Sequence, residues 1–200
     1  AGVCWYFMGG YAGQIKSMQQ EAQQLVRSSN VDTFRAAQTS MVYAADGSLI
    51  STLKGERDSY YLTIDQIPTQ AIEAMVSTED RKFYKHKGID YKAILRAIKV
   101  MIDEGEATQG GSTITMQLAR NVFLSQEKTW QRKVEEMFIA MNLEEKYTKD
   151  QIMEFYLNNI YFSNGYYGVG AAARGYFDKE VSELTVAEQV FIAAIPNNPT

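Results

Sequence analysis

The sequence predicts a mainly α-helical protein with a small β-hairpin near its N-terminus. From Pro68 onward, apolar residues recur at the three- and four-residue spacing of helices, most clearly from Trp130 to Tyr147. Met41 to Leu53 instead alternates apolar and polar residues around Asp46-Gly47, a dipeptide that favours a tight hairpin turn. These two patterns place the strands before the helical part of the chain.

Composition excludes several classes of function. The chain has 200 residues, 46% of them hydrophobic and 22% charged, which is typical of a globular protein with one sizeable core. Its net charge of −4 argues against nucleic acid as a partner. Cys4 is the only cysteine, so no internal disulfide forms, and His86 is the only histidine, so no site can use two imidazoles.

The first thirteen residues, Ala1 to Gly13, carry no charge and mix Trp and Tyr with small residues. A membrane span takes roughly 20 apolar residues, so this segment is too short to be a complete one. We interpret it as the outer end of a transmembrane anchor, although a buried N-terminal segment of a soluble fold is the alternative. The polar run from Gln14 to Gln38 is then expected to be an amphipathic helix. Three regions follow: the anchor end at 1–13, a helical linker with the β-hairpin at 14–64, and a helical domain at 65–200.

Several helices are expected in the domain. The segment from Tyr91 to Asp103 is cationic and amphipathic, and it would either pack on a core or lie on an anionic bilayer. Its apolar face consists of Ile94, Leu95, Ile98, Met101 and Ile102. The helix from Trp130 is expected to bury Trp130, Val134, Met137, Phe138 and Met141. Thr148 and Thr185 begin capping-box sequences that start two more helices. The second of these, Val186 to Ile195, is apolar nearly all round and is expected to be buried.

Glu79 is a carboxylate on an apolar helical stripe. At helical spacing it points the same way as three apolar residues, Ile72, Val76 and Phe83. A carboxyl group among apolar neighbours loses hydration, so its pKa rises and it can accept a proton near neutral pH. The alternative is that the helix ends before Glu79, or that Glu79 pairs with Arg81 or Lys82 at the surface.

Glu136 is a second carboxylate, in different surroundings. Arg132 and Lys133 precede it by four and three residues, the spacing of neighbours on a helix surface, and two cations favour the ionised form. One acid that accepts a proton and one that stays anionic is the division of labour needed for transfer at a sugar anomeric carbon. The alternative is a solvated surface cluster of Glu135 and Glu136.

The segment from Gln109 to Asn121 is a glycine-containing loop that leads into a helix. Backbone amides at a helix start, together with hydroxyl groups and the charge of Arg120, suit a phosphate or pyrophosphate group. The polar side chains that it offers are Ser112, Thr113, Thr115 and Gln117. A plain helix N-cap is the alternative.

Four motifs in order resemble those of the peptidoglycan glycosyltransferases, glycosyltransferase family 51. Glu79 to Gly88 (EDRKFYKHKG) resembles the first signature, E-D-x-x-F-x-x-H-x-G, and Gly110 to Gln117 (GGSTITMQ) resembles the second, G-x-S-T-I-T-Q-Q. Arg132 to Glu136 (RKVEE) resembles the third, R-K-x-x-E, which selects Glu136 over Glu135. Lys149 to Asn158 (KDQIMEFYLN) resembles the fourth. Ordered motifs at proper spacing make this resemblance highly specific.

The resemblance implies a lysozyme-like, two-lobed helical fold, with the glycosyltransferase domain at 65–200 behind a truncated membrane-anchor segment. The family polymerises lipid II into β-1,4-linked glycan strands, with inversion and release of undecaprenyl pyrophosphate. No organic cofactor is implied, although a divalent cation, Mg or Mn, is an option for bridging the pyrophosphate. The implied partners are lipid II, the growing glycan strand, the lipid bilayer and other cell-wall synthesis proteins. The implied location is the extracytoplasmic face of a bacterial cytoplasmic membrane, behind a single-pass anchor, and the chain looks most like a bifunctional class A penicillin-binding protein.

The motifs also imply roles for individual residues. Glu79 would be the general base that deprotonates the acceptor's GlcNAc 4-hydroxyl, and Glu136 would lie on the donor side. The implied substrate contacts are Arg81, Ser112, Thr113, Gln117, Arg120, Arg132 and Lys133. The implied structural positions are Asp80, Phe83, His86, Gly88 and Asn158. No residue is assigned as a metal ligand.

Met116 departs from the family pattern, because it stands where the second motif has the first of two glutamines. One polar contact is therefore absent or supplied elsewhere. Two rival functions remain at this stage: a lysozyme-like hydrolase or lytic transglycosylase, and a non-catalytic membrane scaffold. The cations Arg120, Arg132 and Lys133 favour a pyrophosphate donor, which a hydrolase has no need to bind.

Overall fold

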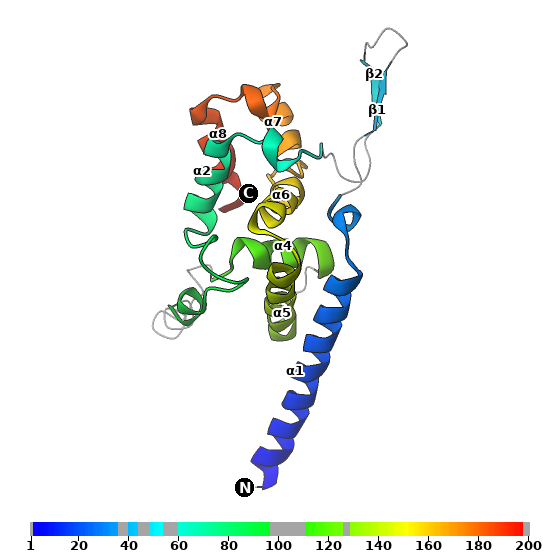
Figure 1. Cartoon of the computed structure of the whole chain (residues 1–200), viewed down its shortest axis with the longest axis vertical. Coiled ribbons are helices and arrows are strands. Elements are labelled where there is room, and N and C mark those ends of the chain that lie inside the picture. The colour runs from blue at the N-terminus through cyan, green and yellow to red at the C-terminus, as the bar shows by residue number, and fades with distance from the viewer. Residues whose placement is uncertain are drawn as a thin grey trace. The chain divides into compact units, whose positions relative to one another are not determined.

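The computed structural model of the chain describes residues 2–35, 40–43, 49–53, 60–96, 111–125 and 129–197. Most of these residues are helical, which confirms the predicted class (Figure 1). The chain forms two compact units, each discontinuous in sequence. The first, here the α5 unit, contains residues 1–29 and 85–148, and the second, the α6 unit, contains residues 30–84 and 149–200.

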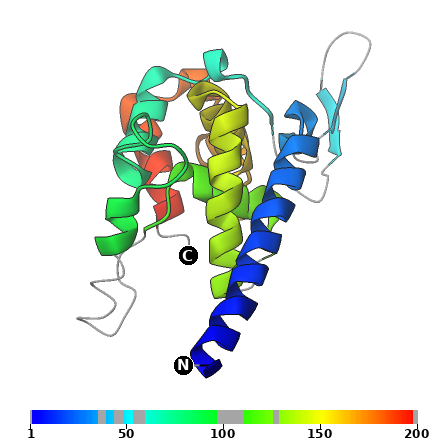
Figure 2. The ribbon, with the colours of Figure 1, turned by 60° about the horizontal axis from the view of Figure 1, so that its bottom comes forward.

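In the α5 unit, helix α1 (Gly2–Ser28) runs beside helix α5 (Trp130–Lys146) (Figures 1 and 2). The buried side chains of α1 are spaced by four residues and form one stripe: Met18, Ala22 and Val26. The expected helix from Gln14 to Gln38 is too long. It ends at Ser28, because Asn30 caps a new 3-10 helix, Val31–Phe34, by accepting a hydrogen bond from the Thr33 amide.

Helix α5 contacts both α1 and α4 (Ile114–Phe123). Its buried residues are Glu136, Ile139, Ala140 and Leu143. The face predicted from the apolar pattern is therefore wrong: Trp130 is 45% exposed, and the other four residues of that face, Val134, Met137, Phe138 and Met141, are half-buried. The true face is set by contact with two helices, and it includes a carboxylate that no apolar pattern can reveal.

A small apolar cluster joins three segments of this unit. Ile89, Met116 and Ala140 are buried together, with Ile94, Met137 and Met141 packed around them. Gly88 precedes the cluster with φ of 91°, and a Cβ there would lie 2.7 Å from the Ala140 carbonyl oxygen, so only glycine fits. Residues 91–96 are helical as predicted, but Leu95 is 66% exposed and does not belong to a buried face. The predicted continuation of this helix, residues 97–103, lies outside the described residues.

The α6 unit contains four α-helices among its described residues: α2 (Thr69–Glu79), α6 (Lys149–Asn159), α7 (Val169–Phe177) and α8 (Val186–Ala194). Short 3-10 helices lie at Ile64–Gln66, Val181–Glu183 and Ile195–Asn197. Helix α2 contacts α8, and the Phe34 ring stacks on the Phe155 ring of α6 with centroids 4.0 Å apart.

Strands β1 (Ser40–Tyr43) and β2 (Leu49–Leu53) of the same unit pair antiparallel, with Ser40 opposite Leu53. The Asp46-Gly47 turn predicted between them lies outside the described residues.

Helix α8 starts at the predicted capping box, in which Thr185 accepts from the Glu188 amide and the Glu188 side chain accepts from the Thr185 amide. Its predicted burial is wrong. Gln189, Ile192 and Ala193 are buried, whereas the opposite side is exposed: Val186 by 60%, Val190 by 50% and Phe191 by 54%. The helix buries one face only.

Across the described ranges, no helix combines the length and the apolar composition that crossing a membrane requires. The interpretation of residues 1–13 as the end of an anchor stays a prediction.

Candidate active site

Glu136 lies on the buried face of α5 and is fully buried, with a side chain that is 0% exposed. Its Oε1 accepts a hydrogen bond from Lys133 Nζ at 2.5 Å, one helical turn earlier. The alternative of a solvated surface cluster therefore does not hold for Glu136. A buried carboxylate that is ionised needs such a partner, because desolvation of an isolated charge is costly.

Lys133 also connects the third motif to the second. Its Nζ donates to Ser112 Oγ at 2.6 Å, so the same ammonium binds the loop before α4 and the carboxylate on α5. The Lys133 side chain is 39% exposed, which leaves it accessible from solvent. An ammonium has three donors, and two are used by these contacts. The remaining donor can serve an anionic ligand.

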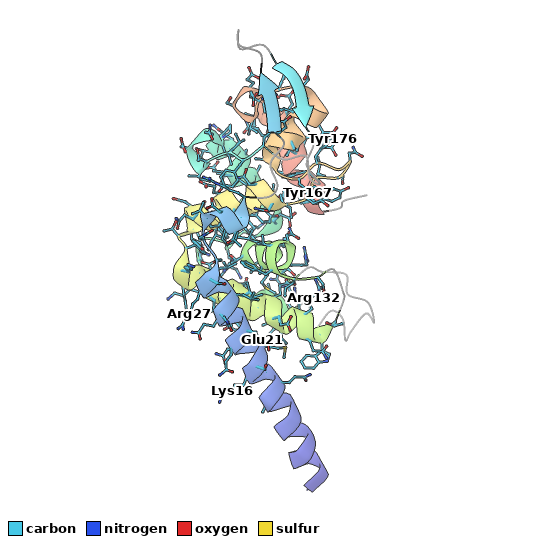
Figure 3. The ribbon with its side chains drawn as sticks, turned by 90° about the vertical axis from the view of Figure 1, so that its right-hand side faces the viewer. Lys16, Glu21, Arg27, Arg132, Tyr167 and Tyr176 are labelled. Carbon is cyan, nitrogen blue, oxygen red and sulfur yellow. The ribbon has the colours of Figure 1, made fainter. Side chains whose placement is uncertain are left out.

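Two polar atoms next to this pair have unused hydrogen-bonding capacity. Within the part of the chain that the structure describes, Glu136 Oε2 and Arg132 Nε are buried and form no hydrogen bond. Figure 3 marks Arg132 near the start of α5. Buried polar atoms are nearly always satisfied, so each of these two atoms can bond a further ligand, ion or water. Arg132 Nε can donate a hydrogen bond to an anion, and Glu136 Oε2 can bind a cation or accept a hydrogen bond from water.

Thr113 and Ser112 have different roles in the second motif. Thr113 caps α4: its Oγ1 accepts from the Met116 amide at 3.1 Å and donates to the Gly88 carbonyl oxygen at 2.5 Å. Thr113 is 2% exposed and its hydroxyl is bonded within the fold, so the substrate contact that the motif implies for it stays a prediction. The plain N-cap reading holds for Thr113, whereas Ser112 reaches Lys133. Further along α4, Gln117 is buried at 8% exposure and Arg120 is half-buried.

Met116 is 0% exposed and packs against Ile89 and Ala140. Its side chain therefore faces an apolar cluster of the α5 unit. The glutamine that the family pattern expects here would place an amide in that cluster.

Glu79 is the last residue of α2 in the α6 unit and is half-buried. The helix ends there because Asp80 leaves the helical region, with φ of −157°. Phe83 therefore does not continue the predicted stripe. The buried residues of α2 are Ala71 and Met75, while Ile72 and Val76 are half-buried and line an open groove of about 690 Å³. The apolar stripe was thus misassigned, although Glu79 itself lies on the helix.

The rest of the first motif organises the chain after α2. Arg81 Nε donates to the Ser77 carbonyl oxygen at 3.1 Å, which satisfies a backbone group in the last turn of the helix. Asp80 is 9% exposed and Phe83 is fully buried, with Lys149 Nζ 4.3 Å from the ring centroid of Phe83. His86 is half-buried in the α5 unit.

Asn158 of the fourth motif ties α6 to the segment before α2. It is 2% exposed, its Oδ1 accepts from the Leu62 amide at 2.8 Å, and its Nδ2 donates to the carbonyl oxygens of Leu62 and Glu154, each at 2.8 Å. These contacts fix the position of Leu62, in the segment that precedes α2.

Two polar contacts were not anticipated from the sequence. Thr115 Oγ1 donates to Glu144 Oε1 at 2.7 Å, and Tyr61 OH donates to Glu154 Oε1 at 2.6 Å. Glu144 follows Glu136 by eight residues, which places it about 80° further round α5, so the spacing alone does not reveal it. The partner of Glu154 is distant in sequence, so no local pattern indicates it.

The structure therefore describes two separate sets of candidate residues, one within each unit. The α5 unit has a buried carboxylate bonded to a lysine, with a hydroxyl and an arginine beside them, and the α6 unit has a half-buried carboxylate at a helix end. A mainly helical protein with carboxylates and such a group of cationic and hydroxyl side chains fits the class of enzymes that transfer sugars from phosphate-bearing donors.

Comparison with known families places the chain within this class. Residues 46–200 match the transglycosylase family, so the chain belongs to that family. The resemblance inferred from the four motifs is confirmed, and the matched residues form a glycosyltransferase domain.

The relatives are penicillin-binding proteins. Penicillin-binding protein 4 of Bacillus subtilis is 43% identical over 188 residues, which are 94% of this chain and 30% of that protein. Penicillin-binding protein 1A of Escherichia coli is 49% identical over 159 residues, 80% of this chain and 19% of that protein. Penicillin-binding protein 1F of Bacillus subtilis is 50% identical over 139 residues, 70% of this chain and 20% of that protein. The chain thus spans between 19% and 30% of the length of these relatives.

Proposed function

We propose that this domain is a peptidoglycan glycosyltransferase that polymerises lipid II into β-1,4-linked glycan strands, with inversion and release of undecaprenyl pyrophosphate. The observation that carries the proposal is the buried Glu136 bonded to Lys133, which is in turn bonded to Ser112. Lys133 has a third donor beyond its two contacts with described residues, and with the buried Arg132 Nε it suits a pyrophosphate leaving group. A glycan hydrolase has no such group to bind.

On the donor side, Lys133 and Arg132 are proposed to neutralise the negative charge that grows on the pyrophosphate as the glycosidic bond breaks. Glu136 holds Lys133 in place, since its Oε1 accepts a hydrogen bond from the ammonium at 2.5 Å. Gln117 and Arg120 are proposed to complete the contacts of the donor from α4.

The described residues offer one atom, Glu136 Oε2, that could bind a divalent cation. Glu136 Oε2 is a buried oxygen without a hydrogen bond in the described ranges, and a carboxylate oxygen is a suitable ligand for Mg or Mn. No cluster of three or more acidic, histidine or cysteine side chains that could hold a metal occurs among the described residues. Such an ion would therefore take most of its ligands from the pyrophosphate and water, and it would supply further charge neutralisation to the leaving group.

Glu79 is proposed as the general base that takes the proton from the acceptor's 4-hydroxyl. It is half-buried at the C-terminal end of α2, and a carboxylate is a suitable group to accept a proton from a sugar hydroxyl. The oxygen then attacks the donor's anomeric carbon as the bond to the pyrophosphate breaks, which inverts the configuration.

The finer assignments follow from the same proposal. We infer a lysozyme-like, two-lobed fold, a single-pass anchor ending near Gly13, and a catalytic domain on the extracytoplasmic face of a bacterial cytoplasmic membrane. Lipid II, the growing strand and the bilayer are the proposed partners, together with other cell-wall synthesis proteins. The relatives support a class A penicillin-binding protein as the parent protein.

The proposal is tested by exchanging Glu79 for Gln. Loss of a general base costs about 10² to 10⁴-fold in rate, so Glu79→Gln should slow glycan formation from labelled lipid II by that factor. Glu73→Gln, an exposed carboxylate of the same helix, is the matched control and should keep the wild-type rate. If Glu79→Gln polymerises as fast as the wild type, Glu79 is not the base.

The same assay separates the rival functions. Longer glycan made from lipid II supports the polymerase. Soluble fragments released from preformed glycan would instead identify a lytic enzyme. If neither lipid II nor preformed glycan is turned over, the non-catalytic scaffold is the function supported.

A further inference from the structure

The C-terminal ends of α1 and α5 are fastened to each other. Lys146, the last residue of α5, donates through Nζ to the carbonyl oxygens of Val26 at 2.8 Å and Arg27 at 3.1 Å, and also to that of Ser29. The last carbonyl groups of a helix have no partner inside it, and they carry partial negative charge. One ammonium therefore satisfies three carbonyl oxygens at the end of α1.

A second contact lies beside the first. Ser29 Oγ and Tyr147 OH are 2.9 Å apart, and these two residues are 6% and 9% exposed. The apolar stripe of α1, which ends at Val26, is buried as well. Apolar packing alone would allow one helix to slide along the other, whereas directional hydrogen bonds at the ends fix a single register. We name Lys146, Ser29 and Tyr147 the end clamp.

The end clamp fixes helix α5, which carries Arg132, Lys133 and Glu136, here called the donor cluster. Lys133 precedes Lys146 by thirteen residues, and Gly13 precedes Val26 by the same number. At 1.5 Å per residue, both distances are roughly 20 Å along their helices. Figures 1 and 2 show α1 and α5 leaving their fastened ends in the same direction. Lys133 and the end of the uncharged segment 1–13 therefore lie at comparable distances from the clamp, on the same side of it.

We propose that Lys146 is a positioning residue, and that the end clamp sets the height of the donor cluster above the membrane. With α1 held in register, Lys133 and Glu136 stay near the level at which α1 leaves the bilayer, where the pyrophosphate of a lipid-linked donor lies. The inference rests on the proposed function and on the predicted anchor. Figure 3 marks the charged residues of α1, Lys16, Glu21 and Arg27, and Arg132 near the start of α5.

Register matters here because the donor cannot leave the lipid surface. A slip of one helical turn would move the cluster by about 5.4 Å relative to α1. Misplacement of a reacting group by even 1 Å can cost about 100-fold in rate. A donor in detergent can follow the cluster, whereas a donor in a bilayer is confined to one depth.

The first test compares the two lipid environments, with the full chain in vesicles of phosphatidylglycerol and phosphatidylethanolamine or in detergent micelles. Lys146→Met should lower the rate from lipid II about tenfold in vesicles and less than about twofold in detergent. Lys146→Arg keeps a donor to the carbonyl groups and should restore the rate in vesicles. Lys16→Met removes the same charge from an exposed position on α1 and should change neither rate. Equal losses in both environments, or no loss in vesicles, would overturn the proposal.

The second test measures depth without any turnover. Trp5 and Trp130 are the only tryptophans, so Trp5→Phe leaves Trp130, at the start of α5, as the single fluorophore. In vesicles with brominated lipids, quenching of Trp130 reports its depth. In the Trp5→Phe background, Lys146→Met should shift the bromine position of strongest quenching or broaden the depth profile. An unchanged profile would contradict the clamp.

The rate and quenching measurements separate a failure of the proposed function from a failure of the proposed role of the end clamp. If the wild type makes no glycan in either environment, the proposed function fails, and Trp130 quenching alone decides the role of the clamp. If Lys146→Met does not fold, Tyr147→Phe removes only one hydroxyl group and should give a smaller change of the same kind in vesicles. Loss of rate by Tyr147→Phe to the same extent in both environments would count against the proposal.

Discussion

Glu136 and Asn158 are buried polar residues on consecutive helices, α5 and α6, but their hydrogen bonding differs. Asn158 makes three hydrogen bonds to backbone groups, which join α6 to Leu62 and to its own preceding turn. Glu136 has one partner, Lys133, on Oε1, while its Oε2 has none within the described residues. A satisfied buried group is explained by the fold, whereas a partly satisfied one retains capacity for a ligand.

The comparison separates motif residues that build the domain from those available for chemistry. Asn158, Thr113 and Gly88 belong to the family's motifs, and their contacts are made within the fold. Lys133 and Glu136 belong to the motifs too, and among the described residues Glu136 Oε2 has no hydrogen-bond partner, while the contacts of Lys133 use two of its three donors. Membership of a motif therefore does not by itself mean contact with substrate.

The largest effect on stability is expected from Lys133→Met. It leaves the carboxylate of Glu136 buried without its partner, which should destabilise the fold by about 3 kcal/mol, at the low end for broken buried pairs because Lys133 is 39% exposed. Urea unfolding measures this loss, and the double variant Lys133→Met/Glu136→Gln should recover part of it. Lys92→Met, an exposed lysine of the same unit, is the control. A Lys133→Met protein as stable as that control would show that Glu136 does not need its partner.

Asn158→Leu should cost slightly less, about 2 to 3 kcal/mol, because the amide and carbonyl of Leu62 lose their partner. Unlike Lys133→Met, it should leave the rate per folded molecule unchanged. Asn158→Asp keeps an acceptor for the Leu62 amide and should be milder. A lower rate per folded molecule, corrected for the folded fraction from unfolding curves, would break the distinction drawn between the two residues.

Met116→Gln tests whether this motif position belongs to the core. Burial of an amide among Ile89 and Ala140 should destabilise the protein by about 2 kcal/mol, although it restores the family's usual residue. Met116→Leu keeps the apolar volume and should cost about 1 kcal/mol or less. Thermal unfolding ranks the two variants. A Gln variant that was more stable or faster than the wild type would place the position in the site.

The smallest effect concerns Tyr61, whose pKa is raised by burial and by its hydrogen bond to Glu154. The folded state thus keeps the neutral phenol, and the resulting stability is present below the ordinary pKa of about 10 and is lost as the pH rises above it. Tyr61→Phe should be about 1 kcal/mol less stable than the wild type at pH 8. The difference should shrink in urea unfolding above pH 10. A difference that is constant with pH would contradict this assignment.

Much of the fold could be predicted from local sequence. Helix α5 was expected over Trp130 to Tyr147 and forms over Trp130–Lys146, because its periodicity is long and strong. Thr185 correctly marks the start of α8, since a capping box is a local hydrogen-bond pattern. Which face of a helix is buried was predicted poorly. That property depends on neighbours distant in sequence, as the exposed Trp130 and Phe191 show.

The sequence predicts which residues belong to the candidate site better than it predicts which residues they contact. The motifs selected Glu79 and Glu136, and the spacing of Lys133 to Glu136 correctly indicated a contact. The contact of Lys133 with Ser112 spans 21 residues and has no local signal. Lys146 was missed for the same reason: its partners at the end of α1 lie about 120 positions earlier in the chain.

The α5 unit is built from two segments that are distant in sequence, and this has a practical consequence for producing the protein. That unit contains residues 1–29 as well as 85–148, and α1, whose buried stripe runs from Met18 to Val26, packs on α5. A shortened, more soluble version should therefore begin no later than about Gly13. A clone beginning after Ser29 would expose apolar surface on α5 and leave the ammonium of Lys146 without its three carbonyl acceptors, so poor yield from such a clone would reflect a missing piece of the fold.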